Sequence, residues 1–129
     1  MNAKLPAELL NAWNDREGPV ILTTVDAVGT PNSIYAGIAH LTSDGRLAVT
    51  DNYFFKTKAN IDARTKACLL FITKQGNAYQ IKGTIDYHTI GPLYDEMLLW
   101  SDPKHPRKGV AVLNALEVFR GSEKVLYDI

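Results

Sequence analysis

TDNYFFKTKANIDAR, residues 50–64, joins the end of a predicted strand to the start of a short predicted helix. The run LAVT that ends at residue 50 is typical of a strand, and Ala59 and Ile61 suit two helical turns packed against a core. Three side chains at this junction suit a phosphate group: Lys56, Thr57 and Asn60. A phosphate monoester is held best by backbone N–H groups at a helix start, an ammonium and a hydroxyl. The stretch therefore predicts a phosphate-binding corner.

The same residues also have a purely structural interpretation. Thr57 belongs to the residue types that cap helices, and Lys56 and Lys58 would then be solvated charges. Both interpretations fit the spacing.

The length and charge of the chain restrict the class of protein to which it can belong. At 129 residues it is expected to form a single domain, residues 1–129. Lys plus Arg and Asp plus Glu are equal, at 14 each, so no basic surface is expected to collect nucleic acid. No segment resembles a signal peptide or approaches the roughly 20 apolar residues that cross a bilayer. We expect a cytoplasmic protein that binds neither nucleic acid nor membrane.

Apolar and alternating segments between turn signals predict a mainly β protein. Six or seven strands are expected, at residues 19–26, 31–41, 46–51, 66–74, 78–88, 110–119 and, as a last edge strand, 123–129. The run 66–74 is expected to be buried on both faces, and Gly83 to mark a bulge or a bend where the barrel curves. Short helices are predicted at 6–14, after Lys56, and at 92–100. Hairpin connections favour an antiparallel barrel over a parallel sheet.

The common catalytic motifs are absent from the sequence. There is no G-x-S-x-G elbow, no Walker loop and no G-x-G-x-x-G fingerprint. The histidines His40, His88 and His105 show no metal-binding spacing, so no metal site is predicted. The single cysteine, Cys68, lies in an apolar run where a thiol packs as a small hydrophobe. The catalytic residues, if any, remain unassigned.

The order of these segments resembles a known family. Six segments follow one another along the chain: VD, the Gly-Pro turn, PNSIYAGIAH, DGRLAVT, KTKANIDARTKACLLF and YQIKGTIDY. Their order resembles that of the pyridoxamine 5′-phosphate oxidase-like, FMN-binding split-barrel family. In particular, the chain resembles the small bacterial FMN-binding proteins of that family. The resemblance spans about residues 18–120. It rests on the order of all these segments, because the motif KT-x-AN is too short to be specific by itself. It implies a split β-barrel that binds FMN.

The resemblance also implies which residues hold the cofactor. Lys56 and Thr57 would bind the FMN phosphate, with Asn60 either ordering the corner or joining in the binding. The ribityl chain and ring would run along Thr50, Asp51 and Asn52, and the pyrimidine side of the ring would be bordered by Ser33, Ile34 and Tyr35. Thr23 and Thr24 are weaker candidates for the same wall. The alternative for Ile34 and Tyr35 is that they only pack the barrel.

In this family the cofactor lies between two subunits, so the resemblance implies a homodimer. A small barrel is filled by its own side chains, and a tricyclic ring needs a second surface. Trp100 and the loop 103–108 are candidates to complete the partner's site. Members that oxidise pyridoxamine phosphate carry a C-terminal basic cluster, and this chain offers only Arg107, Lys108 and Arg120.

The sequence therefore predicts an FMN-binding flavoprotein, either an oxidoreductase or an electron carrier, that exchanges electrons with a small-molecule partner or substrate. Two alternatives stay open. One is a non-catalytic module that binds a small molecule, and the other is a deazaflavin-dependent reductase on the same fold.

Overall fold

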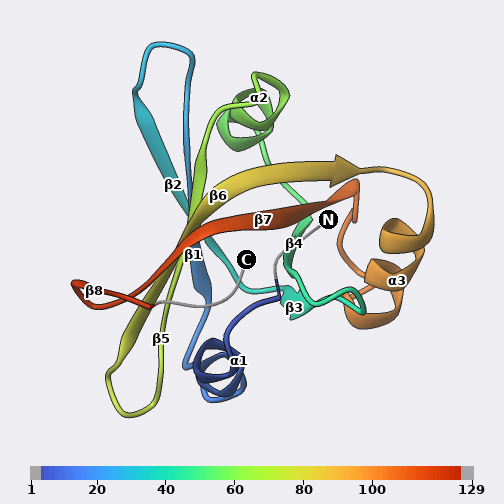
Figure 1. Cartoon of the computed structure of the whole chain (residues 1–129). Coiled ribbons are helices and arrows are strands. Elements are labelled where there is room, and N and C mark those ends of the chain that lie inside the picture. Colours follow the sequence, from blue (N-terminus) through green and yellow to red (C-terminus); the bar gives the residue numbers. More distant parts are fainter. Residues whose placement is uncertain (1–3, 126–129) are drawn as a thin grey trace.

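A computed structural model describes residues 4–125, and in this part of the chain one antiparallel sheet of eight strands curls into an open half-barrel (Figure 1). The helices are α1 (Ala7–Asn14), α2 (Lys56–Asp62) and α3 (Pro92–Trp100). The strands are β1 (Val20–Val25), β2 (Pro31–Ala36), β3 (Ala39–Leu41), β4 (Leu47–Asp51), β5 (Ala67–Ile72), β6 (Ala78–His88), β7 (Gly109–Arg120) and β8 (Glu123–Lys124). The prediction of a mainly β, antiparallel split barrel with short helices is confirmed.

The two edges of the sheet are joined by the chain itself. The strand order is β2-β1-β5-β6-β7-β4-β3, with β8 on β7, so β2 and β3 are the outermost strands. A bend at Gly37 and Ile38 separates them, where one strand, 31–41, was predicted. The carbonyl of Ile38 accepts a hydrogen bond from the N–H of Thr50, at 3.1 Å. The bend therefore connects β2, at one edge of the sheet, to β3, which pairs with β4 at the other edge.

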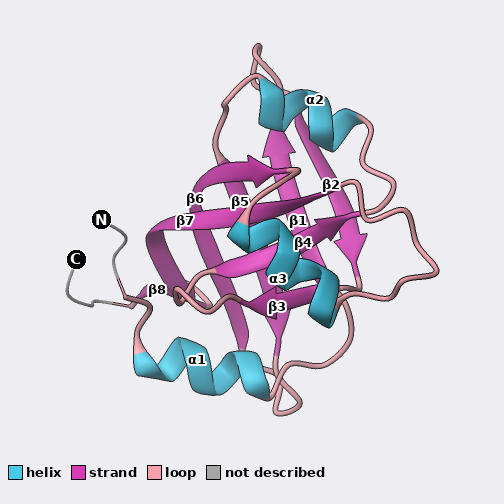
Figure 2. Cartoon of the chain, turned by 90° about the vertical axis from the view of Figure 1, so that its right-hand side faces the viewer, coloured by secondary structure: helices cyan, strands magenta, loops and turns pink. Residues whose placement is uncertain are grey.

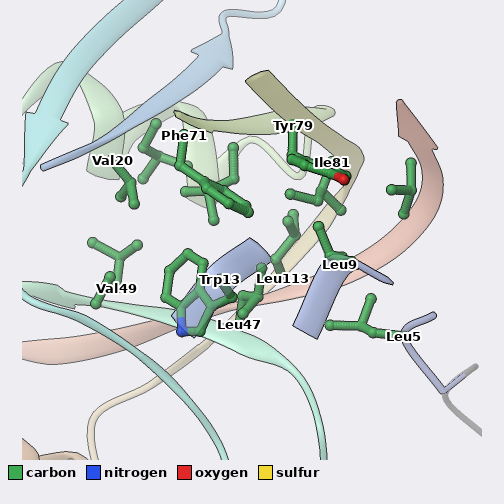
Figure 3. Close-up of a cluster of buried hydrophobic side chains, with 14 of the residues drawn as sticks. Leu5, Leu9, Trp13, Val20, Leu47, Val49, Phe71, Tyr79, Ile81 and Leu113 are labelled. Carbon is green, nitrogen blue, oxygen red and sulfur yellow. The ribbon is translucent and has the colours of Figure 1, made fainter. Parts of the chain in front are cut away.

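The core fills the inside of the curled sheet, and α1 closes its lower end (Figures 1 and 3). Trp13 of α1 meets Phe71 edge to face, with the ring centroids 5.2 Å apart, and Phe71 stacks on Tyr79 at 5.7 Å. Leu9 and Ile81 in the same cluster are fully buried. Burial of these large apolar side chains is the main favourable term in holding α1 to the sheet.

Strand β5 differs from its prediction. Ala67, Leu69 and Phe71 are buried, whereas the alternate residues Cys68 and Leu70 are only half-buried. The expectation that this run is buried on both faces was wrong, because only its inner face meets the core. The residues on the outer face are also apolar, so the sequence does not show the alternation of apolar and polar residues that marks a strand with one buried face.

The predicted irregularity at Gly83 is confirmed. The register of β6 against β7 shifts between Lys82 and Gly83. A Cβ at residue 83 would lie 1.8 Å from the backbone oxygen of Asn114, so only glycine allows the two strands to approach this closely.

Helix α3 packs on a second, smaller cluster, over β4 and β7 (Figure 2). Met97 is fully buried there against Ala48, Val110 and Val112. Of the helices that the structure describes, none has the length and apolar character needed to cross a membrane.

Candidate functional site

The predicted strand-to-helix junction is present: β4 ends at Asp51 and α2 begins at Lys56. Asp51 is 2% exposed, and its carboxylate accepts hydrogen bonds from the N–H of Phe54, at 2.9 Å, and from the hydroxyl of Tyr87. The carbonyl of Asp51 accepts another from the N–H of Lys108, at 2.8 Å. Asp51 therefore shapes the turn between β4 and α2, and both of its carboxylate oxygens are engaged within the protein.

Burial and the neighbouring carboxylate raise the pKa of Tyr87, with burial the larger cause. The phenol therefore stays protonated at neutral pH and remains a donor to Asp51.

The first turn of α2 exposes one cation. Lys56 is exposed, and among residues 4–125 it has no carboxylate partner. Lys58, by contrast, pairs with Asp62 at 2.8 Å and lies 4.7 Å from the centroid of the Tyr87 ring. Because α2 has only seven residues, its attraction for an anion rests on the Lys56 ammonium more than on a helix dipole.

Thr57 does not cap α2. The N-cap is Phe55, which makes no side-chain cap, and Thr57 is the second residue of the helix. Its side chain is 1% exposed, and its oxygen lies 3.2 Å from Nδ2 of Asn32, which donates to it. Asn60 is also buried and donates through Nδ2 to the hydroxyl of Thr24, at 2.9 Å. These two residues therefore tie α2 to β1 and β2.

A cavity of about 240 Å³ lies beside this turn, and we call it the α2 cavity. It is lined by Asp26, Thr30, Pro31, Asn32, Lys56, Ala59 and Asn60. Its charged side chains are Lys56 and Asp26. The Asp26 carboxylate accepts the N–H groups of Val28, at 3.0 Å, and Thr30, at 2.8 Å, which ties it to its own turn.

A second cavity, of about 360 Å³, lies between β2 and the end of β4, and we call it the β4 cavity. It is lined by Ile34, Tyr35, Ala36, Gly37, Ile38, Thr50, Asn52, Tyr53, Phe54 and His105. Thr50 is 4% exposed, and its hydroxyl has no hydrogen-bond partner within the described part of the chain. A buried hydroxyl without a partner is costly and calls for an explanation.

The two cavities follow each other along the same two segments. Asn32 of β2 and Lys56 border the α2 cavity, whereas Ile34 of β2 and Phe54 border the β4 cavity. Two residues of a strand span about 7 Å, so a ligand with a ring at one end and an anion at the other can occupy both.

The predicted site residues thus fall into three sets. Ile34, Tyr35, Thr50 and Asn52 line the β4 cavity, and Lys56 and Asn60 line the α2 cavity. Three others line neither: Ser33, Asp51 and Thr57. The hydroxyl of Ser33 lies 2.7 Å from that of Thr23, the residue opposite it on β1.

The loop 101–108 joins this site within the same chain. His105 lines the β4 cavity, and its Nδ1 lies 3.3 Å from the hydroxyl of Tyr53. The N–H of Arg107 donates to Oδ1 of Asn52, at 2.9 Å. The loop 103–108 is a candidate to complete the partner's site, and within its own chain it borders the β4 cavity through His105. Trp100 lies elsewhere, stacked on His40 at 5.1 Å.

Sequence reasoning did not single out Asn32 and Tyr87, and it considered His105 only as part of the loop 103–108 for the partner's site. Asn32 and Tyr87 each reach the site across a long separation in the chain, 25 residues from Asn32 to Thr57 and 36 from Asp51 to Tyr87. No local pattern marks such contacts. No group of three or more metal-binding side chains occurs among the described residues.

Comparisons with known proteins agree on the architecture. The model of the pyridoxamine 5′-phosphate oxidase family matches residues 6–120. HupZ of Group A Streptococcus superposes with a TM-score of 0.79 at 21% identity, covering 96% of this chain and 99% of HupZ. No curated protein matches the chain.

Two further solved structures are similar. A putative pyridoxamine 5′-phosphate oxidase of Lactobacillus delbrueckii has a TM-score of 0.74 at 25% identity, covering 90% of this chain and 93% of its own. An FMN-binding protein of Syntrophomonas wolfei has a TM-score of 0.74 at 17% identity, covering 91% of this chain and 84% of its own. Likeness at such low identity shows the fold.

Proposed function

This chain belongs to the pyridoxamine 5′-phosphate oxidase family, and from that premise we propose that it is a flavoprotein that binds FMN along β2, with the ring in the β4 cavity and the phosphate at Lys56. The observation that carries the proposal is the adjacency of the two cavities, one largely apolar and one with an ammonium, that of Lys56, which has no carboxylate partner among the described residues. Bound FMN would supply electron transfer to and from a small-molecule partner.

The β4 cavity suits a flavin ring in its chemistry. Ile34, Ile38 and Phe54 offer apolar cover, and the buried hydroxyl of Thr50 offers a hydrogen bond that nothing else in the described chain takes. Ligand sites of this kind combine apolar walls with a few placed polar groups. A polar ring edge near Thr50 would satisfy that hydroxyl and gain affinity.

The α2 cavity suits the phosphate. Lys56 supplies the charge, and the Asn32 amide borders the same space. The buried hydroxyl of Thr57 accepts a hydrogen bond from Asn32 and so holds the Asn32 side chain in place. Its role in this proposal is therefore to position Asn32, since its side chain is almost fully buried.

The open side of the β4 cavity supports a homodimer. Tyr35 is 76% exposed and Tyr53 is 69% exposed, and both line the β4 cavity. A second copy of the chain, related by a two-fold axis, would cover these rings and the cofactor twice. Each copy would be one domain, and we propose a cytoplasmic location.

The fold alone does not choose the cofactor, because solved structures of this fold include an F420 reductase and a heme storage protein. A deazaflavin-dependent reductase and a non-catalytic binding module are therefore the competing outcomes. No side chain is assigned as an acid or base, so an electron carrier fits the site as well as an oxidoreductase does.

Titration of FMN and riboflavin with the purified protein, followed by flavin fluorescence, tests the proposal. Riboflavin lacks the phosphate, so the wild type is expected to prefer FMN. Lys56→Gln is expected to reduce FMN affinity by about tenfold or more and leave riboflavin affinity unchanged, as for a lost charge-assisted contact. Lys58→Gln is the matched control, because Lys58 already pairs with Asp62. A protein that ignores FMN but binds a deazaflavin or heme contradicts the proposal.

A further inference from the structure

We propose that Asp26 makes this site selective for a flavin mononucleotide, because it places a fixed negative charge beyond the phosphate in the α2 cavity. The inference rests on the proposed function and narrows the class of ligand to a flavin that ends in a phosphate monoester. FMN ends at its phosphate, whereas FAD continues from that phosphate through a second one to adenosine. A site can reject the longer molecule by setting an unpaired charge of the same sign against it.

The order of residues along β2 places Asp26 beyond the phosphate. Ile34 borders the β4 cavity, and Pro31, at the start of the same strand, borders the α2 cavity. The turn 26–30 precedes Pro31, and its residues Asp26 and Thr30 also line the α2 cavity. Asp26 therefore stands on the side of this cavity that faces away from the ring, where the second phosphate of FAD would extend.

Hydrogen bonds hold the Asp26 side chain in one position. Its Oδ1 accepts the N–H groups of Val28, at 3.0 Å, and Thr30, at 2.8 Å. The N–H of Asp26 donates to the carbonyl of Thr30, at 2.9 Å, and Gly29 supplies the positive φ, 92°, that this turn requires. The carboxylate cannot turn away from the cavity without giving up both of its bonds, so its charge is a fixed part of the wall.

The charge of Asp26 is not neutralised by a neighbouring cation. Asp26 forms no ion pair within residues 4–125, although Lys56 lines the same cavity. The two opposite charges are therefore held apart, at the walls of a space of about 240 Å³. One phosphate bound by Lys56 occupies this space, and a second phosphate attached to it would approach Asp26.

The selectivity follows from the distances between charges. Like charges repel each other more strongly the closer they are, and the second phosphate of FAD would lie nearer to Asp26 than the phosphate held by Lys56. Removing the Asp26 charge should therefore strengthen the binding of FAD more than that of FMN. Salt should act in the same direction on the wild type, because ions screen charges at a partly exposed site.

Calorimetric titration of the purified protein with FMN and with FAD measures the selectivity. At low salt we expect the wild type to bind FMN about tenfold or more tightly than FAD. Asp26→Asn is the test variant, since its side-chain oxygen can still accept both N–H groups of the turn. It should gain about tenfold in FAD affinity and about threefold or less in FMN affinity.

The matched control is Asp15→Asn, which removes the same charge from the end of α1, at the opposite end of the sheet from α2 (Figure 1). Asp15 lines neither cavity, so this variant should keep the preference of the wild type. The wild type provides a second test that needs no substitution. In about 1 M salt its preference for FMN should shrink to that of Asp26→Asn.

The outcomes separate this inference from the proposed function. Equal affinity of the wild type for FMN and FAD overturns the role of Asp26 while FMN binding stands. The same holds for a preference that salt and Asp26→Asn leave unchanged, and for one that Asp15→Asn reduces equally. A protein that binds no FMN overturns both statements.

Discussion

The hydroxyl of Tyr87, on β6, donates a hydrogen bond to the buried carboxylate of Asp51 at the end of β4. Gly109, the residue opposite Asp51 on β7, makes room for this contact, because a Cβ there would lie 2.5 Å from the Tyr87 ring. The turn from β4 to Lys56 therefore depends on a tyrosine, an aspartate and a glycine from three different strands.

Replacing Tyr87 by phenylalanine should destabilise the protein. One oxygen of a carboxylate that is 2% exposed loses its donor, and a buried acceptor left without a partner costs about 1–3 kcal/mol. Urea unfolding of the wild type and Tyr87→Phe measures the change. An unchanged midpoint would show that water replaces the phenol and that the turn does not depend on it.

Gly109→Ala should destabilise the protein by pushing the Tyr87 ring away from Asp51. The loss should be much smaller when Tyr87 is already alanine, because the added methyl group then meets nothing. A double-mutant cycle of Gly109→Ala and Tyr87→Ala gives this coupling, which we expect to exceed about 1 kcal/mol. Additive effects would mean that glycine is needed at this position for a reason other than the tyrosine.

Thr50→Val should separate binding from stability. Valine has the same shape and removes a hydroxyl that has no partner among the described residues, so the unliganded protein should be as stable or more stable. FMN affinity should fall by about three- to tenfold, as for one lost hydrogen bond. Calorimetry of unfolding and a fluorescence titration measure the two quantities.

Thr42→Val is the control for that experiment, because Thr42 is equally buried but its hydroxyl accepts the N–H of Arg46, at 3.0 Å. This variant should lose stability and keep its FMN affinity. Identical behaviour of the two variants would remove Thr50 from the binding site.

Glu8 should make stability depend on pH in the acid range. Hydrogen bonds from Tyr79 and then Arg120 lower the pKa of Glu8 below its ordinary value of 4.5. A carboxyl with a lowered folded pKa stabilises the protein above its unfolded pKa, and this contribution is lost as pH falls through the folded pKa. Stability should therefore fall below pH 4.5 more steeply in the wild type than in Glu8→Gln, as thermal melts at several pH values would show. Parallel profiles would contradict this assignment.

The sequence predicts the fold well because the fold follows local signals. Alternation along β1 and β6 and the helical spacing of α1 and α3 are visible within short windows. The bulge at Gly83 was predicted for the same reason. The bend between β2 and β3 was missed, because Gly37 stands in a run whose apolar residues continue without a break.

The site was predicted only in part. Thr50 lies in a strand and Lys56 at the start of a helix, as the adjacent sequence predicts. Contact of Asp51 and Thr57 with FMN stays a prediction; in the structure their side chains are buried and hydrogen-bonded to Tyr87 and Asn32. Burial and long-range partners are set by the packed fold, and no spacing in the sequence encodes them.

A crystal structure of the protein grown with FMN tests the central claim most directly. We predict the ring in the β4 cavity beside Thr50 and the phosphate within hydrogen-bonding distance of Lys56. FMN bound away from β2, or an empty β4 cavity in crystals grown with saturating FMN, would contradict the account.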